Sequence, residues 1–167
     1  KALFEAVAAG RTNQELANEM YGHIGAGELL ERWRDTNLRM ATQLGELPAK
    51  TRLPWYGPDM GVRMFTTARL MEAWAHGQEV YDMKKVTREP TDRLHGVATI
   101  GVKTFGGTFV NRGEDPPGPP PYVRLVAPSG EIWKWGEPSD TSTVKGDALD
   151  FCQVVTQVRN IADTRLQ

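Results

Sequence analysis

Two residues that could bind a metal ion, Glu72 and His76, are four positions apart in a segment that the sequence predicts to be one long helix. Residues 59–83 contain no proline, and Asp59 after Pro58 is typical of a helix N-terminus. At about 100° per residue, side chains four apart lie on one face. A carboxylate and an imidazole placed in this way can share a zinc, nickel or iron ion. The pair is half a site, because zinc usually takes three or four ligands.

The helix face that carries this pair is otherwise largely apolar. The residues that fall within it are Val62, Phe65, Arg69, Glu72, His76, Val80 and Met83. A carboxylate and an imidazole among buried apolar residues need partners. The alternative is an ordinary helical i, i+4 pair, worth a few tenths of a kcal/mol, or a hydrogen-bonded core histidine. Spacing alone does not separate the two interpretations.

Composition excludes several classes of protein. The chain has 167 residues, 40% hydrophobic content and a net charge of −1, with 20 basic and 21 acidic residues interspersed, which is typical of a globular protein. Neither a nucleic-acid-binding patch nor a membrane-binding segment is indicated. The single cysteine, Cys152, favours a cytoplasmic location. No dinucleotide, phosphate-loop, C-x-x-C or nucleophile-elbow motif is present.

Helical patterns fill the first two thirds of the chain. We expect short helices over residues 2–9 and 12–21, and a longer one over 26–44 that ends at Gly45 and buries Trp33. A proline-containing loop then leads to Trp55 and Tyr56, which could cover a metal site or plug the end of a helical bundle. Residues 91–112 fit a helix, although 97–102 could also form a strand.

The pattern changes after GEDPPGPPP, residues 113–121, which holds five prolines and two glycines. Beyond it, alternation predicts a β-hairpin over residues 122–135, a third strand over 141–145 and a helix over 147–158. The expected fold class is therefore α+β. The expected domains are a helical portion (1–112), a connector (113–121) and a small α+β domain (122–167).

The chain resembles the actinobacterial metal-binding proteins related to mycothiol-dependent maleylpyruvate isomerase, of the DinB-like four-helix-bundle superfamily. The resemblance rests on LPWYGPDMGVRMFTTARLMEAWAHGQEVYD, REPTDRL, APSGEIWKWG and GDALDFCQVVTQ, and runs from about Gly27 to Gln167. It implies a DinB-like bundle followed by a sterol-carrier-like unit. In that family a Glu and a His on one helix bind a divalent metal with a His from an earlier helix, so Glu72 and His76 match two of three ligands.

The resemblance also implies where the site is incomplete. His23, the only upstream histidine, lies in GHIGAG and does not match the family's ligand helix, and the family supplies no ligand at His95. The chain would then lack an N-terminal helix and be truncated at its C-terminus. Arg159 is the position nearest to an active-site arginine of the family.

These observations predict a metal-dependent isomerase or thiol transferase that acts on a small acidic or unsaturated metabolite. The resemblance implies mycothiol as the thiol and a divalent metal, for which we expect zinc. Arg69 and Arg159 are candidates for binding an acidic substrate, with Trp55 and Tyr56 beside them, although Arg69 could instead pair with Glu72. The alternative is a metal-free module that binds a small molecule or mediates association, and a homodimer stays open.

Overall fold

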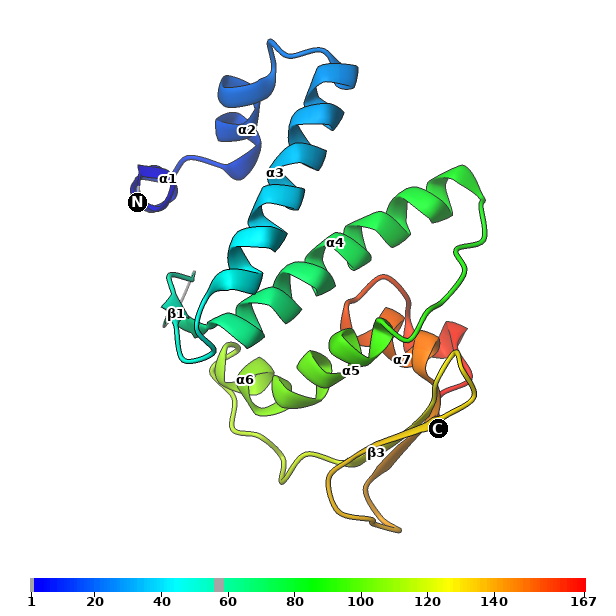
Figure 1. Cartoon of the computed structure of the whole chain (residues 1–167). Helices are drawn as coiled ribbons and strands as arrows, with labels where there is room; N and C mark the ends of the chain where they lie inside the picture. Colours follow the sequence, from blue (N-terminus) through cyan, green and yellow to red (C-terminus); the bar gives the residue numbers. More distant parts are fainter. Residues whose placement is uncertain (1, 56–58) are drawn as a thin grey trace. The chain divides into compact units, whose positions relative to one another are not determined.

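The computed structural model describes residues 2–55 and 59–167, which form two compact units, Lys1–Thr66 and Thr67–Gln167. The described chain combines helices with two small sheets (Figure 1). The predicted α+β class is therefore confirmed. The expected domain boundaries around residues 113–121 do not coincide with the division at Thr66, and that segment lies inside the second unit.

The first unit contains three helices and a two-stranded antiparallel sheet: α1 (Ala2–Ala8), α2 (Asn13–Tyr21), α3 (Ala26–Glu46), β1 (Arg52–Leu53) and β2 (Met60–Gly61). Thr12 and Glu15 cap α2 reciprocally, each side chain accepting a hydrogen bond from the other's backbone N–H. All three predicted helices are present. Two details were wrong: α3 continues through Gly45, and Trp33 is 57% exposed instead of buried.

The long helix α4 spans Val62–Lys84. Asp59 is not its N-cap, because Met60 and Gly61 first pair with β1 and the helix begins only afterwards. At its other end, Lys85 adopts a left-handed conformation with φ 56°, and Val86 N–H donates to the Tyr81 carbonyl. This closing turn satisfies carbonyl groups that the last turn of the helix would otherwise leave unpaired.

The second unit builds one core from α4 and most of the elements that follow it. The elements after α4 are α5 (Leu94–Lys103), α6 (Phe105–Val110), β3 (Tyr122–Val126), β4 (Ile132–Trp135), β5 (Thr143–Asp147), α7 (Ala148–Val155) and the short 3-10 helix η1 (Ile161–Asp163). Trp74 of α4, Leu94 and Val97 of α5, Leu125 of β3 and Phe151 of α7 belong to the same buried cluster. Burial of this apolar surface holds the unit together.

The sheet of the second unit has the order β4-β3-β5. The predicted hairpin is confirmed: β3 and β4 are antiparallel, with Leu125 opposite Trp133, and Val123 and Leu125 point into the core. The third strand lies two residues later than predicted and runs parallel to β3. Its outer edge is paired as well, because Lys145 and Gln167 exchange both backbone hydrogen bonds.

Helices α5 and α7 lie side by side (Figure 1). The close approach occurs at Gly101, where a methyl group would come within 2.8 Å of Val155. Residues 97–102 are therefore helical, which removes the strand alternative, and a break at Thr104 divides the predicted helix into α5 and α6.

None of the helices in residues 2–55 and 59–167 combines the length and the apolar character needed to cross a membrane.

Candidate functional site

Glu72 and His76 are in contact on α4. Glu72 Oε2 lies 3.5 Å from His76 Nε2, and the other ring nitrogen, Nδ1, lies 3.3 Å from Glu79 Oε2. The side chains of Glu72 and His76 are 39% and 72% exposed. The pair thus faces the same way, as the spacing predicts, but on an open helix face.

The expectation that the apolar residues of this face are buried was wrong for its C-terminal part. Val80 and Met83 are 54% and 70% exposed. In the second unit α4 instead buries Trp74 and Gln78, which lie roughly opposite Glu72 and His76 around the helix. The large ring of Trp74 anchors α4 to the core of the second unit.

The separation of the two donor atoms can be compared with what a metal ion requires. Two donors about 2.0–2.2 Å from a tetrahedral zinc lie roughly 3.4 Å apart, close to the 3.5 Å between Glu72 Oε2 and His76 Nε2. Each ring nitrogen of His76 faces a carboxylate, Nδ1 that of Glu79 and Nε2 that of Glu72. The tautomer with hydrogen on Nδ1 is the one that leaves the Nε2 electron pair free for a metal ion. Glu72 and His76 therefore fit two positions of a divalent metal site.

The described residues do not complete such a site. They contain no group of three or more His, Cys, Asp or Glu side chains arranged to hold a metal ion. The third histidine, His95, belongs to α5, and its ring packs against β4 of the hairpin. The ring centroid lies 4.9 Å from that of Trp133 and 5.3 Å from that of Trp135. His95 itself is exposed in the first turn of α5.

Arg69 and the aromatic residues before α4 have separate environments. Among the described ion pairs, Glu72 contacts His76 and not Arg69, so the alternative Arg69–Glu72 pair is not formed. Trp55 packs edge-on against Phe65, with ring centroids 5.4 Å apart. Tyr56 lies outside the described residues.

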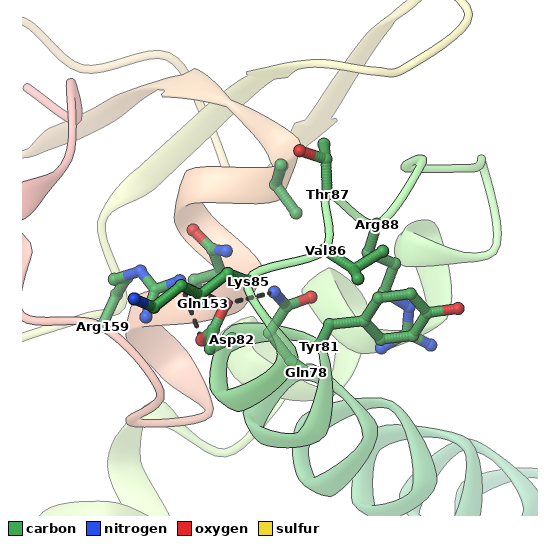
Figure 2. A pocket seen from close by; sticks show the side chains of 10 residues that line it. Gln78, Tyr81, Asp82, Lys85, Val86, Thr87, Arg88, Gln153 and Arg159 are labelled. Carbon is green, nitrogen blue, oxygen red and sulfur yellow. Dashed lines mark hydrogen bonds and ion pairs between the residues drawn. The ribbon is translucent and has the colours of Figure 1, made fainter.

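Arg159 follows α7 and reaches the C-terminal end of α4 (Figure 2). Its Nη2 donates to the Asp82 carboxylate at 2.9 Å, and Gln78 Nε2 donates to the same carboxylate at 3.0 Å. Asp82 is ten residues, or about 15 Å, along the helix from Glu72. The structure therefore brings Arg159 to Asp82, and none of its described contacts reaches the Glu72–His76 pair.

A cleft of about 390 Å³ opens around this ion pair. Its lining residues are Gln78, Tyr81, Asp82, Lys85, Val86, Thr87, Arg88, Leu149, Gln153 and Arg159. Apart from Arg159, none of these residues was predicted from the sequence as part of a site. One pattern in the sequence could have revealed them. Trp74, Gln78 and Asp82 are four residues apart, so two polar residues share a helix face with a large aromatic residue that is buried.

The Asp82–Arg159 pair makes stability depend on pH. Hydrogen bonds from Arg159 and then Gln78 lower the pKa of Asp82 below its usual 3.8. Its contribution is therefore present above pH 4 and is lost as the pH falls through the lower folded-state value. We expect Asp82→Asn to lower the free energy of unfolding at pH 7 by up to about 1 kcal/mol, and by much less near pH 2. Denaturant titrations at both pH values measure this difference, and an equal loss at both would contradict it.

The sequence is similar to one family model and to two proteins from Mycobacterium tuberculosis. Residues 2–81 match the family model described as the mycothiol maleylpyruvate isomerase N-terminal domain. Two uncharacterized proteins from two strains of Mycobacterium tuberculosis are each 41% identical over 139 residues, which is 83% of this chain and 54% of theirs. No solved structure gives a significant match.

The structure thus defines an α+β protein. Its N-terminal region is helical, and its long helix α4 carries a Glu–His pair. The match to the mycothiol maleylpyruvate isomerase N-terminal domain covers residues 2–81, just under half of the chain, and the resemblance predicted from sequence is confirmed. The chain spans about half the length of the curated relatives that it matches.

Proposed function

We propose that the chain is part of a metal-dependent, thiol-linked isomerase or transferase that acts on a small acidic or unsaturated metabolite. The observation that carries the proposal is the contact between Glu72 and His76, 3.5 Å apart within the segment that matches the isomerase family. Zinc suits this donor pair, and mycothiol is the thiol that the family name indicates. When bound, a divalent ion supplies Lewis acidity and lowers the pKa of a thiol.

Three residues of the chain would prepare such a site. Glu72 and His76 would supply two ligands, and Glu79 would orient the His76 ring by accepting a hydrogen bond from Nδ1. Further ligands would come from water or from residues outside this cluster.

Arg69 would attract an acidic substrate. It lies one helical turn before Glu72 and forms no ion pair with it in the described structure. A guanidinium group binds a carboxylate through two parallel hydrogen bonds, which makes Arg69 the nearest candidate for that role on this helix.

The test is zinc binding by the 167-residue chain, measured by calorimetry on protein freed of metal with a chelating resin. We expect His76→Ala and Glu72→Ala to weaken binding at least about tenfold, since each removes one of few ligands. Glu79→Gln should weaken it about tenfold through the His76 ring. His95→Ala is the matched control and should leave binding unchanged. Equal zinc affinity in the wild type and His76→Ala would overturn the proposal.

The alternative is a metal-free binding module, and the cleft between α4 and α7 favours it. The same calorimetry separates the two functions, because zinc binding that depends on Glu72 and His76 is expected for the enzyme and not for the module.

A further inference from the structure

The cleft at the C-terminal end of α4 carries an excess of positive charge. Lys85, Arg88 and Arg159 line it with a single carboxylate, Asp82, so two positive charges are in excess among the lining residues (Figure 2). Arg159 Nη2 forms an ion pair with Asp82 Oδ2 at 2.9 Å, so part of the Arg159 charge is already neutralised. Asp163 lies close enough to Arg159 to add to its stabilisation but does not line the cleft. The lining therefore favours an anionic ligand.

Arg88 forms a fixed wall of this cleft. Its Nη1 donates to the Trp74 carbonyl at 2.8 Å, and its guanidinium carbon lies 5.4 Å from the Trp74 ring centroid and 5.3 Å from that of Tyr81. A guanidinium held between two aromatic rings keeps its position without a carboxylate partner. The positive charge of Arg88 is therefore already placed before a ligand arrives.

Gln78 contributes an unpaired acceptor. Its side chain is 5% exposed, and Oε1 is buried without a hydrogen-bond partner in the described structure. The amide cannot simply be turned around, because Asp82 is an acceptor and only the NH₂ end of Gln78 can bond to it. Figure 2 shows the Gln78 oxygen on the side of the amide away from Asp82. A buried acceptor without a donor is costly, so an N–H or O–H group that enters the cleft would gain a hydrogen bond to this oxygen.

Lys85 is the most adaptable of the three cations. It holds the left-handed position that ends α4, where φ is 56° and glycine would be less strained. Its side chain is exposed at the edge of the cleft and has no ion pair among the described contacts. Lys85 is thus available to pair with a ligand.

We propose that this cleft is a second binding site, separate from Glu72 and His76 and independent of a metal, for a small anion that carries a hydroxyl or N–H donor. Lys85, Arg88 and the outer face of Arg159 would neutralise the anionic group, and Gln78 Oε1 would accept the hydrogen bond from the donor. Hydroxycarboxylates and hydrogen phosphate share this chemistry. The cleft, with a volume of about 390 Å³, is large enough for a small hydroxycarboxylate or for phosphate.

The test is calorimetric titration of the metal-free 167-residue chain with L-malate, succinate and inorganic phosphate. Malate and succinate differ by one hydroxyl group, and we expect malate to bind about three- to tenfold more tightly. Gln78→Leu, close to Gln in size, should remove this advantage by weakening malate binding more than succinate binding, since only malate has the hydroxyl group that Gln78 Oε1 would accept from. Lys85→Gln should weaken every ligand that binds, about three- to tenfold. Circular dichroism and thermal melts establish that each variant is folded.

Lys84→Gln is the matched control, because it removes the same charge from the neighbouring residue outside the cleft. Phosphate binding without malate binding, with the same dependence on Gln78 and Lys85, would support the site and assign it to phosphorylated ligands. The proposal is overturned if none of the three anions binds saturably, if Lys84→Gln weakens binding as much as Lys85→Gln, or if Gln78→Leu keeps the preference for malate.

Discussion

Gly101→Ala is expected to lower the free energy of unfolding by about 1–3 kcal/mol, although alanine is the better helix former. Gly101 lies in α5, and a methyl group there would come within 2.8 Å of Val155 Cγ2 and 3.0 Å of Val155 Cβ on α7. Neither helix can move away freely, since Leu94, Val97 and Cys152 of the same two helices are almost completely buried. Chemical denaturation of the variant and the wild type measures the change.

Two variants separate this clash from the general effect of replacing a glycine. Gly107→Ala is the matched control in α6, where no atom lies within 4 Å of the added methyl, and it should be stabilising by up to about 1 kcal/mol. Val155→Ala should rescue Gly101→Ala in part, with a coupling energy of roughly 1 kcal/mol. If Gly101→Ala behaves like Gly107→Ala, α5 and α7 are not packed as described.

The sequence predicted the second unit well where side-chain period and burial coincide. Val123, Leu125 and Ala127 alternate with exposed neighbours and point into the core, so the hairpin follows directly from the pattern. The helix predicted over residues 91–112 is also present as α5 and α6, and the close approach of Gly101 to Val155 shows why α5 carries small residues. In both cases the partner of each residue lies within the same unit.

Sequence reasoning was weaker for α4, because helical period identifies faces but not which face is buried. The face with Val80 and Met83 looked like the core, yet Trp74 and Gln78 are buried instead. The cleft residues were missed for a related reason. Asp82 and Arg159 are 77 positions apart, and an ion pair over that distance leaves no local pattern.

For the candidate metal ligands Glu72 and His76, the sequence predicted the local contact but not its surroundings. Spacing four residues apart in a helix was enough to predict that Glu72 and His76 are in contact, because helix geometry alone sets that relation. It could not indicate the role of Glu79, which lies three residues beyond His76 and faces its other ring nitrogen. That contact depends on the orientation of the imidazole ring, which no sequence pattern encodes.

The thiol of Cys152 is expected to react with a disulfide reagent at pH 8 about a thousandfold more slowly in the folded chain than in the unfolded one. The side chain is 0% exposed and its Sγ donates to the Leu94 carbonyl at 3.5 Å. Burial raises the pKa of Cys152 from 9.0 to about 12, and a shift of roughly three units reduces the reactive thiolate about a thousandfold. The release of a coloured thiolate from the reagent, with and without denaturant, gives both rates.

The same shift has a consequence for stability. A thiol whose pKa is higher in the folded state stabilises fully below the ordinary value, and this contribution is lost as the pH rises from about 9 towards 12. Cys152→Ala should therefore lose less stability than the wild type between pH 8 and pH 10.5. Similar reaction rates in the folded and unfolded chains would show that the thiol is accessible, contrary to the structure.

A slowly reacting Cys152 also bears on the proposed chemistry. It is the only cysteine in the chain, and its sulfur faces α5 inside the core of the second unit, where neither a substrate nor a metal ion can reach it without unfolding. A thiol-linked reaction at Glu72 and His76 would then need a thiol that is not part of these 167 residues. If folded Cys152 reacted rapidly, no external thiol would be required. Cys152 itself could then be the thiol of the proposed reaction.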